Sequence, residues 1–157
     1  MIVGERDIAS TTRSRATSEV GRKRGTDVFR PLTDEHPDDE TFPGLLILRT
    51  EGRVYFGNAQ NIGDRLSVLV HEARPRVLLL DCSGIPGFEY TAFKMLAQAE
   101  AKLREESVDL WLAALAPEAL RQVQASPLGT LLGRERMFFT VGQAVDRYAE
   151  RAQNQRT

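Results

Sequence analysis

Short hydrophobic runs alternate along this chain with stretches whose apolar residues recur at helical spacing. The runs at residues 45–48, 77–80 and 108–115 are too short for buried helices and are rich in Leu, Ile and Val, which is typical of strands buried on both faces. Between and after them, one-sided apolar spacing predicts helices, carried by Ile62, Leu66, Leu69 and Val70, by Ala92, Met95, Leu96, Ala99 and Leu103, by Leu120 and Val123, and by Val141, Ala144, Val145 and Tyr148. Strands alternating with helices predict an α/β fold with parallel pairing.

A hairpin is expected at the start of this pattern. Residues 45–49 and 54–56 are both strand-like, and residues 50–53 between them contain Gly52, so the two strands would pair antiparallel around a turn. The exposed edge of such a hairpin is one route to a homodimer.

Polar residues gather around the hydrophobic run at residues 77–80. Asp81 closes this strand, and we expect its carboxylate to accept hydrogen bonds from the loop that begins at Ser83. After the loop, Glu89, Tyr90 and Thr91 stand where the next helix begins. Asp81, Ser83, Glu89, Tyr90 and Thr91 are therefore the candidate residues for recognition or regulation.

The same stretch resembles the signature region of the STAS domain, the module shared by sulfate transporters and anti-sigma factor antagonists. Asp81-Cys82-Ser83 matches the D-x-S with which the family's strand ends, and Glu89-Tyr90-Thr91-Ala92 stands where an acid and hydroxyl residues open the next helix. The segments G-T-D-V-F-R at residues 25–30, P-G-L-L-I-L-R at 43–49 and V-Y-F-G-N-A at 54–59 are similar to the cytoplasmic STAS domain of sulfate permease (SulP) anion transporters.

This resemblance implies a fold and a function. The fold would be α/β and SpoIIAA-like, with a central mixed sheet of about four to five strands and helices mainly on one face. The domain would be a non-catalytic cytoplasmic regulator whose partner is the membrane part of a transporter of sulfate, bicarbonate or related anions, or another regulatory protein. It would be membrane-associated when part of a full transporter.

Two alternatives concern the start of the helix at Tyr90. In the antagonist branch of the family a hydroxyl here is phosphorylated, so a free-standing antagonist-like regulator would carry phosphate on Tyr90 or Thr91. A nucleotide or anion could instead bind weakly here, since free N–H groups and the helix dipole attract negative charge.

Composition removes several other classes of function. The net charge is −1, which does not suggest nucleic-acid binding. One cysteine and two histidines exclude an internal disulfide and the usual zinc clusters. Cys82 at a buried strand end should be an inert thiol, and Ser83 has no recognisable base. We therefore expect no enzyme activity, no metal and no cofactor, and a reducing cytoplasm.

The chain is expected to form one domain. Residues 1–19 lack an apolar period and should be disordered or loosely packed. The domain would span residues 20–152, with a basic and then acidic lead-in at 20–43, a core at 44–152, and a tail at 153–157. No stretch approaches the roughly 20 apolar residues that span a bilayer.

Overall fold

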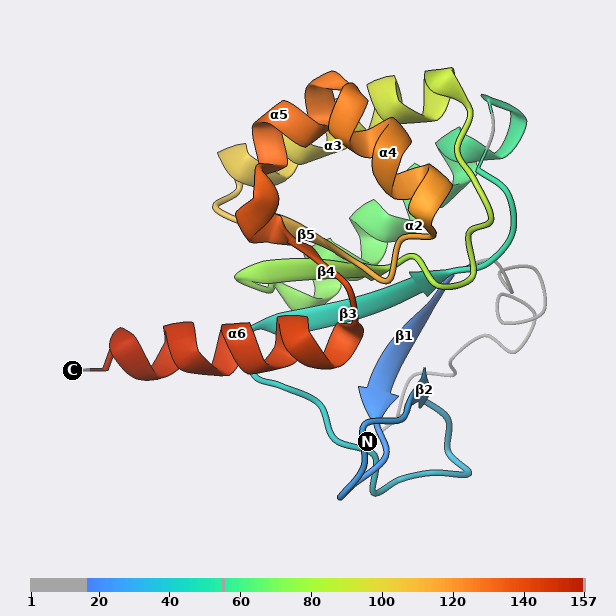
Figure 1. The fold of residues 1–157 in the computed structure, drawn as a ribbon. Helices are drawn as coiled ribbons and strands as arrows, with labels where there is room; N and C mark the ends of the chain where they lie inside the picture. The colour runs from blue at the N-terminus through green and yellow to red at the C-terminus, as the bar shows by residue number, and fades with distance from the viewer. Residues whose placement is uncertain (1–16, 55, 157) are drawn as a thin grey trace.

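The computed structural model describes residues 17–54 and 56–156, and its centre is one sheet in which the described residues form six strands (Figure 1). The strands are β1 (Thr17–Arg22), β2 (Phe29–Pro31), β3 (Leu45–Thr50), β4 (Val77–Asp81), β5 (Asp109–Ala113) and β6 (Met137–Phe138), in the order β2-β1-β3-β4-β5-β6. Strands β3 to β6 are parallel, whereas β1 is antiparallel to both β2 and β3. The mixed α/β fold is therefore confirmed, with more strands than the four to five expected.

Helices cover the two faces of the sheet unequally (Figure 1). Helices α2 (Phe56–Ala73), α3 (Tyr90–Glu105), α4 (Pro117–Ala125) and α5 (Pro127–Leu132) share one hydrophobic core with alternate residues of the central strands, and α6 (Val141–Asn154) packs on the remaining residues of those strands. In β4, for example, Leu78 and Leu80 face the larger core, while Val77 and Leu79 face α6. A continuous apolar run is needed because both faces are covered.

A cap and a tyrosine hold α6 in place. Thr140 Oγ1 accepts a hydrogen bond from the Gln143 N–H at 3.1 Å, which satisfies one of the free N–H groups at the start of the helix. The short 3₁₀-helix η1 (Arg134–Arg136) and β6 lead into this cap. Farther along α6, the Tyr148 hydroxyl donates to the Pro43 carbonyl at 2.7 Å. Gly44 is required beside it, because its φ is +81° and a Cβ there would overlap the Tyr148 hydroxyl.

The predicted hairpin at residues 45–56 is wrong. Strand β3 pairs with β1 on one side and β4 on the other, and Val54 instead forms a parallel bridge to Phe88. Helix α2 already includes Gly57 and Asn58. The dimer expected through the edge of that hairpin therefore loses its structural basis.

The expectation for residues 1–19 falls mostly on residues outside the described part of the chain. Its last residues, Thr17 to Glu19, lie in β1 and pair with residues 48–50 of β3. Thr17 is buried, and its hydroxyl lies 3.3 Å from that of Thr50. The ordered sheet thus begins earlier than the boundary at residue 20 expected from composition.

Candidate functional site

A buried ion pair lies at the carboxyl end of the central parallel strands. Asp81 ends β4, is 1% exposed, and accepts a hydrogen bond from Arg49 Nε to its Oδ2 at 2.8 Å. Its Oδ1 accepts from the Ser83 N–H at 3.0 Å, which confirms the expected contact between Asp81 and its loop. The carboxylate therefore fixes both the start of the loop and the side chain of the neighbouring strand.

Arg49 extends this network to the start of the sheet. Its Nη2 donates to the Phe29 carbonyl at 3.0 Å, so one guanidinium joins β2 to β4 across the strands between them. No local pattern singles out Arg49 as a site residue. The signal that would have found it is register, because Arg49 and Asp81 are paired residues on adjacent parallel strands.

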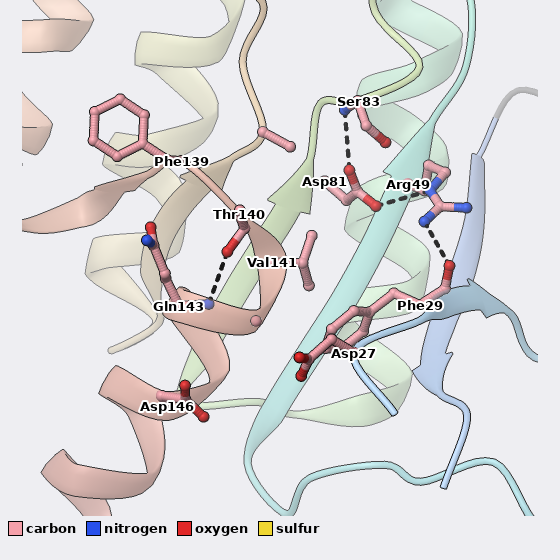
Figure 2. Close-up of a pocket in the computed structure, with 12 residues that line it drawn as sticks. Asp27, Phe29, Arg49, Asp81, Ser83, Phe139, Thr140, Val141, Gln143 and Asp146 are labelled. Atoms are coloured by element: carbon pink, nitrogen blue, oxygen red, sulfur yellow. Dashed lines mark hydrogen bonds and ion pairs between the residues drawn. The ribbon is translucent and has the colours of Figure 1, made fainter. Parts of the chain in front are cut away.

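An open pocket of about 500 Å³ lies beside this pair (Figure 2). The turn between β1 and β2 forms one wall, the carboxyl ends of the parallel strands form the floor, and the beginning of α6 forms the opposite wall. We call this cavity the sheet-edge pocket. The lining residues are Asp27, Phe29, Arg49, Asp81, Ser83, Ala114, Phe139, Thr140, Val141, Gly142, Gln143 and Asp146. Pockets outside the carboxyl ends of parallel strands are the usual ligand sites of open α/β sheets.

The other predicted residues, Glu89, Tyr90 and Thr91, do not line this pocket. All three are exposed at the beginning of α3, and Tyr90 is 84% exposed. Glu89 is the N-cap residue of α3, but its side chain makes no capping hydrogen bond. Its backbone N–H donates to the Val54 carbonyl at 3.1 Å, which holds the helix start against the segment before α2.

The five predicted residues thus fall into two groups. Asp81 and Ser83 belong to the sheet-edge pocket, whereas Glu89, Tyr90 and Thr91 form a separate exposed surface at the start of α3. The loop between the groups is anchored by Ile85 and Phe88, which are buried in the larger core. Sequence reasoning also missed the two walls contributed by the β1–β2 turn and α6, because they are distant from Asp81 along the chain.

Cys82 lies between the two groups but is not available for chemistry. It is 1% exposed, and burial together with the adjacent Asp81 carboxylate raises the pKa of its thiol to about 12. A thiol that stays protonated is a poor nucleophile and metal ligand. Within the part of the chain that the structure describes, no group of three or more His, Cys, Asp or Glu side chains is placed to hold a metal ion.

The fold and the sheet-edge pocket define an α/β domain with a mixed sheet and a polar site at the carboxyl ends of its parallel strands. The family model of the STAS domain matches residues 36–144. The chain therefore belongs to the STAS domain family, as its sequence motifs indicated.

Individual relatives agree with this assignment. High affinity sulfate transporter 2 of Stylosanthes hamata is 29% identical over 151 residues, covering 90% of this chain and 22% of the relative. The inward-facing murine Slc26a9 anion transporter has a similar fold, with a TM-score of 0.76 at 17% identity over 88% of this chain and 23% of that chain. The unphosphorylated anti-sigma factor antagonist SpoIIAA gives a TM-score of 0.58 at 14% identity, covering 71% of this chain and 93% of that chain.

The match covers most of this chain but only a small part of the transporters. The chain spans about a fifth of the length of the sulfate transporter it matches, the share being 22%. Across the described residues, none of the helices has the length and apolarity needed to cross a bilayer. The similarity therefore concerns the STAS portion of those transporters.

Proposed function

We propose that this chain is the non-catalytic regulatory and interaction domain of a SulP-type anion transporter, and that it acts on the cytoplasmic side of the membrane. The observation that carries the proposal is the similarity to sulfate transporters along nine-tenths of the chain. The ion that the transporter carries would be sulfate, bicarbonate or a related anion. The partner of this chain would be the membrane part of the same transporter.

The surface at the start of α3 is our candidate for contact with that partner. Tyr90 is the most exposed of the large hydrophobic side chains of the described residues, at 84%, and the backbone beneath it is fixed through Val54 and Phe88. Tyrosines on rigid supports are enriched among the residues that dominate binding energy. Glu89 and Thr91, its exposed neighbours in sequence, add polar side chains to the same surface.

The antagonist-like alternative has less support at this position. The likeness to SpoIIAA concerns the fold, and Tyr90 stands where that branch of the family carries a phosphorylated hydroxyl residue. The exposed Glu89 carboxylate lies immediately before Tyr90 and would repel a phosphate at the same helix start. The same repulsion acts against a nucleotide or free anion at this helix start.

The proposal is tested in the native host by removing residues 20–152 from the gene and measuring uptake of radiolabelled sulfate, bicarbonate and chloride. Altered uptake of at least one anion is expected, and unchanged uptake of all three would overturn the proposal. A second strain carries Tyr90→Ser, which should weaken association with the membrane part by about tenfold. Val68→Ser is the matched control, because Val68 is a 47% exposed apolar residue on α2.

A further inference from the structure

The sheet-edge pocket has a net negative lining. Arg49 and Asp81 neutralise each other within their ion pair, and the remaining charged residues of the lining are Asp27 and Asp146. Both are exposed. Figure 2 shows their carboxylates directed toward the space between the β1–β2 turn and α6.

Neither of these two carboxylates is satisfied by the protein itself. Among the described residues, no ion pair or hydrogen bond engages the side chain of Asp27 or of Asp146, whereas Asp39, which follows β2, is paired with Arg30 at 2.7 Å. Lys23 and Arg24 of the same turn do not line the pocket. The pocket therefore presents two unpaired negative charges from opposite walls.

Aromatic and polar groups complete the lining. The Phe29 ring stands beside Asp27 (Figure 2), and Phe139, which is 78% exposed, lies at the other end of the pocket. Aromatic faces attract cations, and arginine makes such contacts more often than lysine. The exposed side chains of Ser83 and Gln143 offer oxygen acceptors for the N–H groups of a guanidinium.

The start of α6 works in the opposite direction, but more weakly. A helix N-terminus carries roughly half a positive charge, and the Thr140 side chain already accepts a hydrogen bond from one of the free N–H groups there. Two full carboxylate charges outweigh that partial charge. The pocket thus favours a cation over the sulfate or phosphate that a helix N-terminus would otherwise attract.

We propose that this pocket binds an arginine or lysine side chain from a basic segment of the partner polypeptide, held between Asp27 and Asp146. This inference rests on the proposed function, because it supplies the partner chemistry for the same domain. Cytoplasmic loops next to membrane spans are enriched in Lys and Arg, so the membrane part of a transporter offers such segments. The pocket and the Tyr90 surface would then be two distinct contact sites.

The test is a titration of the isotope-labelled chain with N-acetyl-arginine amide, followed by amide shifts in NMR spectra. Saturable shifts with a dissociation constant on the order of millimolar are expected at the residues lining the pocket. Asp27→Asn/Asp146→Asn should weaken binding at least about fivefold. Asp34→Asn/Asp38→Asn is the control, since it removes the same charge from two exposed acids of the lead-in and should leave binding unchanged.

Three results would overturn the inference. These are shifts that do not saturate at tens of millimolar arginine amide, equal weakening by both double variants, and saturable binding of sulfate to the same amides. A fourth, self-association of the chain that buries the pocket and blocks the arginine probe, would assign the pocket to a second copy instead. Loss of the pocket inference leaves the uptake test untouched, whereas unchanged uptake after domain removal overturns the transporter proposal even if arginine binds.

Discussion

Replacing Arg49 with methionine tests the role of the buried ion pair at the sheet edge. The substitution leaves the 1% exposed Asp81 carboxylate with the Ser83 N–H as its remaining partner, and it also removes the hydrogen bond to the Phe29 carbonyl. Breaking a buried pair from one side costs about 3–5 kcal/mol. Because the Arg49 side chain is 17% exposed, water can partly solvate the site, and we expect about 3 kcal/mol.

Substitution of the other partner, Asp81, and the double variant measure the interaction energy between the two side chains. Asp81→Asn keeps an oxygen for the Ser83 N–H and should lower the free energy of unfolding by about 2 kcal/mol. The double variant Arg49→Met/Asp81→Asn should also lower it by about 2 kcal/mol, which is less than the sum of the two single effects. The stability of a domain is typically 5–15 kcal/mol, so Arg49→Met removes a substantial share of it.

Urea unfolding followed through Trp111 fluorescence is the assay. Trp111 is the single tryptophan and is 4% exposed. A loss of 3 kcal/mol lowers the urea midpoint by roughly 1.5 M for a slope of about 2 kcal/mol/M. The control is Arg121→Met, which breaks an exposed pair with Glu118 and should cost less than about 0.5 kcal/mol. A shift for Arg49→Met no larger than that of the control, or additive single variants, would refute the reasoning.

The remaining predictions concern two glycines, the Cys82 thiol and the Tyr148 hydroxyl. Gly129→Ala should cost about 1–3 kcal/mol, because its Cβ would overlap the Val123 carbonyl oxygen and lie 2.8 Å from Gln124 Cα, both in the backbone of α4. A Cβ at Gly63 meets nothing within 4 Å, so Gly63→Ala should stabilise α2 by about 0.5–1 kcal/mol in urea unfolding. The Cys82 thiol should react with a disulfide reagent roughly a hundredfold more slowly in the native protein than in urea. Because burial raises its pKa from 9.0 to about 12, the unfolded chain loses this proton first, and stability should fall as the pH rises from 9 toward 12. Tyr148→Phe removes the 2.7 Å hydrogen bond to the Pro43 carbonyl and should lower the free energy of unfolding by about 1 kcal/mol.

The elements that the sequence predicted correctly are those whose signals are local. Strand β4 follows from an apolar run, and helices α3 and α6 follow from one-sided helical spacing. The prediction of the hairpin was wrong because the three residues after Arg53 fit either a strand or the start of a helix. Strand β1 was missed because its residues are mostly polar, and it exists through pairing with β3, about 30 residues away along the chain.

The candidate site divides in the same way. Asp81 and Ser83 were found because a strand end and its loop are adjacent in sequence, and their hydrogen bond is present. Arg49, Asp27 and Asp146 were not found, because strand register and the placement of α6 bring them to the same edge. Their roles depend on tertiary contacts that no local pattern records.

Reading the gene upstream of Met1 and blotting membrane and soluble fractions of the native host with an antibody against this domain distinguishes a transporter domain from an independent regulator. We expect an open reading frame that encodes apolar spans, and a membrane-bound band several times larger than this chain. A soluble band at the size of this chain, with a stop codon upstream, would contradict this expectation and would make the domain an independent regulator.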